Sequence, residues 1–225
     1  LVWLRRFGVA VDAQVRACVL RWRAALPTTA AVALLLLHEN AAVIALFILR
    51  GSAATGVYSA GFRLVYVAVS LSLLLSFVFL ARLTRLRAEA PEQLRPFFRR
   101  CIGLAGLAGL LAALVGTAVA RPLVQALYKP VYAASAGIVA CLVWQMAAAP
   151  ARITAFQALN ACGRQKRALT VISIGVTLSL TAIVLGCLRA GAVGAAWGTV
   201  IGEIILMIGV VTAADRTVAL SREDR

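Results

Sequence analysis

The sequence predicts an all-α membrane protein, built as a bundle of six transmembrane helices. Hydrophobic residues occupy 63% of its 225 positions and charged residues only 14%, whereas about a quarter of an ordinary soluble domain is charged. The apolar residues gather into stretches of roughly 20 or more, the length of a helix that crosses a bilayer. Strands of a β-barrel would be about 10 residues long and polar at every second position. We therefore expect helical spans at 24–49, 57–81, 101–120, 133–160, 168–188 and 190–214.

The first three spans have recognisable boundaries. Pro27 lies near the start of the first span, where its missing N–H is tolerated. A short turn at 50–52 ends that span. The arginine-rich stretch 82–100 is expected to form the longest loop, with 82–90 able to extend the second helix. Span three is rich in glycine and alanine, a composition that allows close contact between helices.

The last three spans are separated by short turns. Pro150 lies inside the fourth span and predicts a kink, because proline removes one backbone hydrogen bond and clashes with the preceding turn. The basic turn 162–167 separates spans four and five. Spans five and six meet in a tight hairpin at 189–194.

The basic residues indicate which ends of the spans are cytoplasmic. Seventeen of the 23 lysines and arginines precede span one, follow span six, or lie between spans two and three or four and five. Only Arg50, Arg121, Lys129 and Arg189 lie on the opposite side. The positive-inside rule then places both termini in the cytoplasm. The net charge of +15 is read as this topology signal, and we expect no nucleic-acid partner.

The spans divide the chain into three parts. Residues 1–23 mix arginines with apolar residues and are expected to form a cytoplasmic amphipathic connector on the anionic leaflet or a linker into the first span. Residues 24–214 form the six-helix transmembrane lobe. Residues 215–225 are expected to be a mobile polar tail.

The sequence lacks the signatures of a metal site or an enzyme. Its five cysteines form no Cys-x-x-Cys pair, and His38 is its only histidine, so we expect no metal and no cofactor. Buried free thiols that pack as small hydrophobic groups are the simpler interpretation. A glycine-rich phosphate loop and a nucleophile elbow are also missing, and we predict that the chain is not an enzyme.

Charged residues inside a span are costly and usually face a partner or an aqueous cavity. Arg63 shares one helical face with Thr55, Ser59, Tyr66 and Ser70. This polar stripe is interpreted as a cavity wall that aims a cation at an anionic ligand. The alternative is an arginine that extends to the membrane interface.

The fourth span carries a second candidate, Arg152. Gln145 and Asn160 lie on roughly the same face, next to Pro150. Either this group binds an anion, or Arg152 marks the inner interface at the end of the span.

Three further ionisable residues lie in the middle of spans one and six: His38, Glu39 and Glu203. Histidine is a side chain suited to coupling with protons, so His38 is a candidate for this role, and Glu39 is a candidate proton relay. The alternative for both is a hydrogen-bonded pair that fixes helix packing. Glu203 is expected to balance either Arg63 or Arg152.

Four short stretches carry a family resemblance. They are 53–64 (AATGVYSAGFRL), 127–134 (LYKPVYAA), 159–164 (LNACGR) and 191–199 (GAVGAAWGT). In this order and spacing they resemble the polysaccharide exporters of the multidrug/oligosaccharidyl-lipid/polysaccharide superfamily, in the branch similar to O-antigen flippases. The resemblance covers 24–214 and corresponds to the carboxy-terminal lobe.

The resemblance implies one lobe of a two-lobe flippase that surrounds a central cavity. It implies that lipid-linked oligosaccharide, carried on undecaprenyl diphosphate, crosses the bacterial cytoplasmic membrane. The partner would be a separate amino-terminal lobe or a second copy of the chain. Arg63 and Arg152 would contact the anion, with Tyr66, Ser59, Gln145 and Asn160 lining the cavity, and His38, Glu39 or Glu203 would couple ions.

Rival interpretations come from three classes. A multidrug or cation antiporter of the same superfamily would place unpaired acidic residues in the cavity. A structural membrane subunit of a polysaccharide assembly complex would bind partners without transport. An integral membrane glycosyltransferase would need acidic loops that this sequence lacks.

Overall fold

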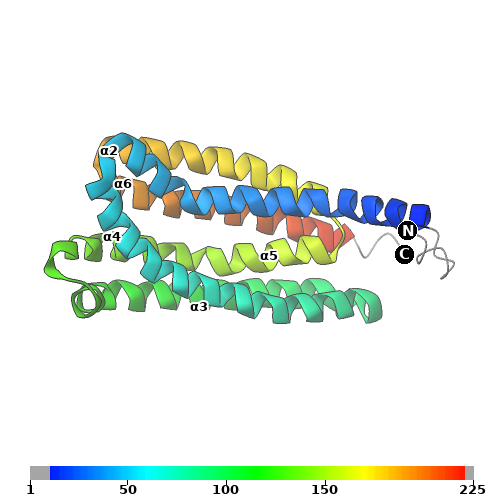
Figure 1. The fold of residues 1–225 in the computed structure, drawn as a ribbon. Coiled ribbons are helices and arrows are strands. Elements are labelled where there is room, and N and C mark those ends of the chain that lie inside the picture. Colours follow the sequence, from blue (N-terminus) through cyan, green and yellow to red (C-terminus); the bar gives the residue numbers. More distant parts are fainter. Residues whose placement is uncertain (1–10, 221–225) are drawn as a thin grey trace.

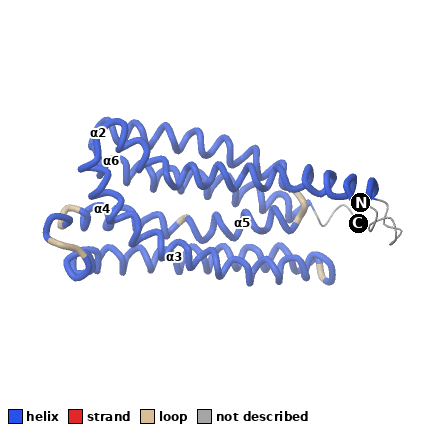
Figure 2. The backbone as a smooth tube through the Cα atoms, viewed as in Figure 1, coloured by secondary structure: helices blue, strands red, loops and turns tan. Residues whose placement is uncertain are grey.

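The computed structural model describes residues 11–220, and its regular elements there are all helices (Figures 1 and 2). Long helices lie side by side, with short connections at the two ends of the bundle (Figure 1). The elements in order are α2 (Val11–Glu89), α3 (Pro91–Leu127), η1 (Pro130–Tyr132), α4 (Ser135–Leu142), η2 (Val143–Ala147), α5 (Ala149–Ala161) and α6 (Gln165–Leu220).

The helices are long and apolar enough for a membrane. Within the described residues, four helical segments meet this criterion: Ala25–Glu89, Pro91–Leu127, Ser135–Ala161 and Gln165–Ala219. Several such helices indicate a multi-pass membrane protein, as the composition predicts. The prediction of six separate spanning helices is wrong, because residues 11–220 form four such helices.

The lower number arises because α2 and α6 each contain two of the predicted spans. In α2 the backbone leaves helical geometry at Gly51, with φ 81° and ψ −178°. In α6 it does so at Ala190 and Gly191, where Gly191 has φ 56°. Positive φ is readily available to glycine because it has no Cβ. The chain reverses direction at both breaks (Figure 1), so one or two residues take the place of the turns predicted at 50–52 and 189–194.

The expected long loop at 82–100 is also wrong. α2 continues to Glu89, Ala90 alone is non-helical, and α3 begins at Pro91. Arginine favours helices, and proline is well suited to the first turn of α3. The possible extension of the second helix through 82–90 is thereby confirmed up to Glu89.

The region around Pro150 is irregular, as predicted. The helix tightens into the 3₁₀ segment η2, and a new α-helix, α5, begins at Ala149. Ala148 donates its backbone N–H to Gln145 at 3.0 Å. Because Pro150 has no N–H to donate, a regular α-helix cannot continue unchanged through this position.

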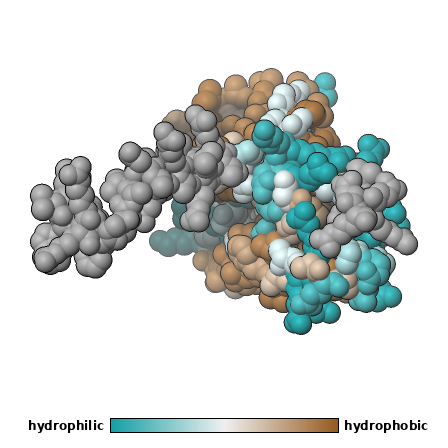
Figure 3. Space-filling model, turned by 90° about the vertical axis from the view of Figure 1, so that its right-hand side faces the viewer, coloured by the Kyte–Doolittle hydropathy of each residue, from teal (hydrophilic) through white to brown (hydrophobic). Residues whose placement is uncertain are grey.

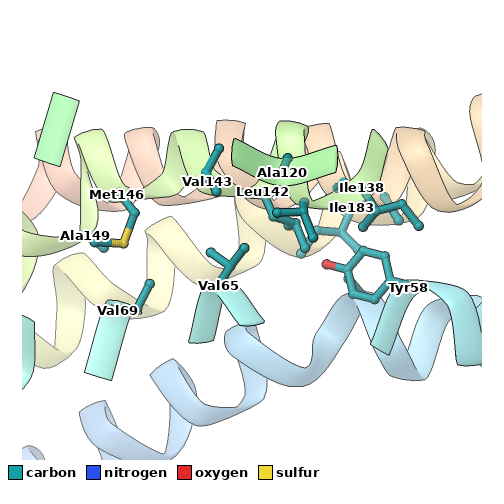
Figure 4. Packing of buried hydrophobic residues seen from close by; sticks show 14 of the residues in the cluster. Tyr58, Val65, Val69, Ala120, Ile138, Leu142, Val143, Met146, Ala149 and Ile183 are labelled. Carbon is teal, nitrogen blue, oxygen red and sulfur yellow. The ribbon is translucent and has the colours of Figure 1, made fainter. Parts of the chain in front are cut away.

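Two apolar clusters form the core. One surrounds Tyr58, Val65, Leu142 and Ile183, and Figure 4 shows these side chains converging from α2, α4 and α6. The other lies toward the opposite end of the bundle. A Cβ on Gly109 of α3 would collide with the carbonyl oxygen of Met146. This contact matches the close packing expected from the small residues of span three.

The structure describes part of each segment outside the predicted lobe. Of the connector 1–23, residues 11–23 belong to α2, and residues 1–10 lie outside the described part. Of the expected mobile tail, residues 215–220 continue α6. Asp215 is bound by Arg95 and Arg99 of α3, which ties this end of the helix to the bundle. Residues 221–225 lie outside the described part.

We call the end of the bundle that carries the turns at Ala90 and 162–164 the basic end. The amino-terminal part of α2 and the carboxy-terminal part of α6 also lie there (Figure 1). Seen from this end, hydrophilic residues gather on the surface and hydrophobic residues form much of its border (Figure 3).

Candidate functional site

Four buried polar side chains meet inside the bundle, and we call them the Arg152 cluster: Arg152, Glu203, His38 and Ser179. Arg152 Nε donates to Glu203 Oε1 at 2.5 Å. The other carboxylate oxygen of Glu203 lies 3.2 Å from His38 Nε2. His38 Nδ1 in turn lies 2.8 Å from the hydroxyl of Ser179. The cluster forms one continuous chain of polar contacts across the core.

Three helices bring these residues together. His38 comes from the first half of α2, Arg152 from the first turn of α5, and Ser179 and Glu203 from the two halves of α6. The restart of the helix at Ala149 positions Arg152, whose backbone N–H bonds to Ala148. Gly202 allows the two halves of α6 to pack closely, since a Cβ there would collide with Ser179.

Burial explains why these groups are paired. Arg152, Glu203 and His38 are each at most 3% exposed. A charge removed from water must find an opposite charge and hydrogen bonds, or the cost is several kcal/mol. Glu203 therefore serves as the counter-ion of Arg152, which decides between the two arginines considered from the sequence.

A pocket of about 380 Å³ adjoins the cluster, and we call it the α2–α5 pocket. Helices α2 and α5 form it. Its polar lining residues are Thr28, Glu39, Tyr66, Ser70, Arg152, Gln157 and Asn160, and the remaining lining is apolar. Asn160 lies one residue before the end of α5, so the pocket extends toward the basic end of the bundle.

Arg152 belongs to both the cluster and the pocket. Of the three side-chain nitrogens of Arg152, only Nε makes a hydrogen bond within the described residues, to Glu203. Its two terminal nitrogens therefore remain available as donors. Glu39 also lines the pocket and makes no salt bridge or side-chain hydrogen bond within residues 11–220. The pocket thus combines a cationic donor group with a carboxylate.

The structure brings together some of the predicted site residues and separates others. Tyr66, Arg152 and Asn160 line the α2–α5 pocket. Arg63 is exposed, and neither it nor Ser59 is among the lining residues. The polar face of α2 therefore lines the pocket only in part: Tyr66 and Ser70 belong to the lining, whereas Ser59 and Arg63 do not.

Two side-chain atoms are buried without a partner in the described structure. Gln145 Nε2 is one, and it lies outside the lining of the α2–α5 pocket. Asn160 Oδ1 is the other, and its side chain lines the pocket. Buried polar atoms normally have a partner, so the Asn160 carbonyl is a ready acceptor for a ligand hydroxyl or amine.

Sequence reasoning missed Ser179 and Gln157. A row of hydroxyl side chains shares one face of the predicted fifth span: Thr170, Ser173, Thr177 and Thr181. Their hydroxyls each bond a carbonyl of their own helix four residues earlier, which is the usual behaviour of such residues. Ser179 lies off that stripe, so periodicity could not reveal it. Gln157 lies between Arg152 and Asn160 in the sequence, and no motif or spacing of its own distinguishes it as a site residue.

The side chains at this site offer hydrogen-bond donors, acceptors and charges to a ligand. Within the described part of the chain, no group of three or more histidine, cysteine, aspartate or glutamate side chains could hold a metal ion. The available groups are a guanidinium that already donates one hydrogen bond to Glu203, a carboxylate, amides, hydroxyls and an aromatic ring. They suit recognition of an anionic or hydroxyl-rich ligand.

Comparison with protein-family models, with curated proteins and with solved structures finds no match.

Proposed function

We propose that this chain is one lobe of an exporter that flips lipid-linked oligosaccharide, carried on undecaprenyl diphosphate, across the bacterial cytoplasmic membrane. In this proposal α2 and α6 each cross the membrane twice, folding at Gly51 and at Ala190–Gly191. With α3 and the α4–η2–α5 segment, the lobe makes six passes and keeps both termini in the cytoplasm. The observation that carries the proposal is the position of Arg152 between the core and the pocket.

Arg152 supports an anionic cargo in two ways. Its bond to Glu203 holds the side chain in place, so little conformational freedom is lost when a ligand binds. Its terminal nitrogens are suited to phosphate oxygens, because a guanidinium offers two parallel donors. A phosphate that enters a bilayer without such a donor would face a large desolvation cost.

The neutral polar groups support a cargo that carries sugars. Gln157 and Ser70 line the pocket on different helices, and Asn160 offers a buried acceptor without a partner. Tyr66 adds an aromatic ring. Hydroxyl-rich ligands are recognised by several placed donors and acceptors together with apolar surface.

The origin of the pocket lining supports a partner lobe. The lining of the pocket comes from α2 and α5 alone, so the α3 and α6 sides of this lobe do not close it. A second lobe, or a second copy of the chain, would complete the cavity. Rocking of the two lobes would then expose the site to one side of the membrane at a time.

A second candidate function is favoured by Glu39. This carboxylate lines the same pocket and has no ion pair within the described residues, the arrangement that a multidrug or cation antiporter would use. The two candidates predict opposite charges for the preferred ligand.

Binding to the full chain in nanodiscs distinguishes these candidates. We expect undecaprenyl diphosphate to bind at least tenfold more tightly than undecaprenol, which lacks the phosphates. The double variant Arg152→Gln/Glu203→Gln removes both charges of the buried pair and should abolish this preference. The matched control Arg63→Gln removes an exposed arginine and should keep it.

Two results would contradict the exporter proposal. One is equal affinity for the two lipids in the unmodified chain. The other is an unchanged preference in the double variant. Tight binding of tetraphenylphosphonium that is lost in Glu39→Gln, without any preference for the diphosphate, would instead favour the cation antiporter.

A further inference from the structure

A second hollow lies at the basic end of the bundle, away from the α2–α5 pocket. It is formed between the start of α3 and the end of α6 and has a volume of about 330 Å³. Its lining residues are Phe98, Arg99, Ile102, Val211, Thr212, Asp215 and Arg216. We call it the α3–α6 crevice.

The charged residues of the crevice are held in place by one carboxylate. Asp215 accepts hydrogen bonds from Arg99 at 2.9 and 3.0 Å, and from Arg95 at 3.4 and 3.0 Å. These two guanidinium groups hold the pKa of Asp215 well below its usual range, so the carboxylate stays ionised. Each arginine donates through Nε and one terminal nitrogen, which leaves its second terminal nitrogen available.

The crevice carries an excess of positive charge. One carboxylate faces two arginines, and the exposed Arg216 adds a third cation. Among the described residues Arg216 forms no salt bridge. An anion would therefore find Arg99 on one wall and Arg216 on the other.

The apolar residues of the crevice lie deeper in the membrane than the charged ones. Ile102 is three residues beyond Arg99 along α3, and Val211 is four residues before Asp215 along α6. Both are one helical turn, about 5 Å, farther from the basic end. Phe98 is buried beside them and forms apolar floor.

We propose that the α3–α6 crevice binds an anionic phospholipid of the leaflet at the basic end. Its phosphate lies between Arg99 and Arg216, and an acyl chain runs along Ile102 and Val211. The charged residues of the crevice lie at the level of a lipid headgroup. Its apolar residues lie one helical turn deeper, where the acyl chain of the same lipid begins. Basic pockets between transmembrane helices at the cytoplasmic surface bind anionic headgroups in this way. The inference goes beyond the proposed function and depends only on the membrane assignment.

The test measures the selectivity of the full chain for anionic lipid. The chain is reconstituted in phosphatidylcholine vesicles, and the association of spin-labelled phosphatidylglycerol is compared with that of spin-labelled phosphatidylcholine. Each arginine near the surface contributes about fivefold to binding of an anionic lipid. We therefore expect Arg99→Gln/Arg216→Gln to reduce the preference about 25-fold, or to abolish it if the preference is smaller.

Two further variants make the result specific. Arg82→Gln/Arg85→Gln removes two exposed arginines from the same end but outside the crevice, and it should keep most of the preference. Val211→Trp fills the crevice without a change in charge and should weaken association of both lipids at this site. Thermal melting of each variant, followed by circular dichroism, confirms that the helices are intact.

Three outcomes would overturn the proposal. The first is an unchanged preference in Arg99→Gln/Arg216→Gln. The second is an equal loss in the Arg82/Arg85 control, which would show attraction to the whole basic surface. The third is displacement of phosphatidylglycerol by inorganic phosphate at constant ionic strength, which would show a site for free anions.

Discussion

Replacing Glu203 with glutamine should destabilise the bundle by about 3 kcal/mol. The substitution keeps the shape of the side chain but removes the negative charge that faces Arg152 at 2.5 Å and His38 at 3.2 Å. Charges about 4 Å apart interact with about 4 kcal/mol at an effective dielectric constant of about 20. A hydrogen bond kept by the glutamine restores about 1 kcal/mol. The remaining loss falls within the range of about 3–5 kcal/mol measured for broken buried ion pairs.

The assay is thermal unfolding of the purified chain in detergent, followed by circular dichroism. For a chain of this size, 1 kcal/mol corresponds to about 2–4 °C, so Glu203→Gln should lower Tm by about 6–12 °C. Glu89→Gln is the matched control, because Glu89 pairs with Arg85 at 2.8 Å while both side chains are more than half exposed. Such a surface pair contributes at most about 1 kcal/mol.

A double-mutant cycle shows whether the pairing itself causes the loss. Arg152→Gln/Glu203→Gln leaves neither charge unpaired, so the double variant should be clearly more stable than the sum of the two single changes predicts. A coupling energy below about 0.5 kcal/mol would refute the argument that Glu203 stabilises the fold as the counter-ion of Arg152.

Two further predictions concern packing and pH. Gly109→Ala should destabilise the bundle by about 1–3 kcal/mol or more, because its Cβ would collide with the carbonyl of Met146. Gly106 has open space where a Cβ would lie. Gly106→Ala should therefore be neutral or slightly stabilising in the same melting assay. Equal Tm values for these two variants would show that α3 and η2 are not in close contact. The bonds of Asp215 to α3 should stabilise the end of α6 by at most about 1 kcal/mol, fully above pH 4 and progressively less as the pH falls through the lowered pKa of the folded state. Asp215→Asn should remove this acid-dependent part of the Tm profile, and an unchanged profile between pH 2 and 5 would contradict the assignment.

The helical class and the membrane assignment could be predicted, because both depend on local composition. A long apolar stretch must satisfy its own backbone hydrogen bonds in lipid, and a helix does so without any partner. The stretches at 101–120 and 168–188 lie inside α3 and α6. The boundaries were predicted less well. Segments 52–56 and 82–100 contain loop-like residues and still became helical almost throughout, since continuation of a neighbouring helix costs little.

The candidate site was predicted in part. The rule that charges inside a span are costly identified His38, Arg152 and Glu203, and the structure places all three in contact. The same rule selected Arg63, which is exposed instead. The depth of a residue along a helix can be counted from the sequence, but the direction in which its side chain points depends on neighbouring helices.

The sequence by itself determined that residues 11–220 are helical and largely apolar, with most of the positive charge at one end of the bundle. These properties follow from each segment and its solvent, without reference to other segments. Only the tertiary structure decided that Glu203 pairs with Arg152, that Ser179 reaches His38, and that α3 and α6 form a crevice at the basic end. Those contacts join residues far apart in the chain, and they depend on how the helices rotate and approach one another.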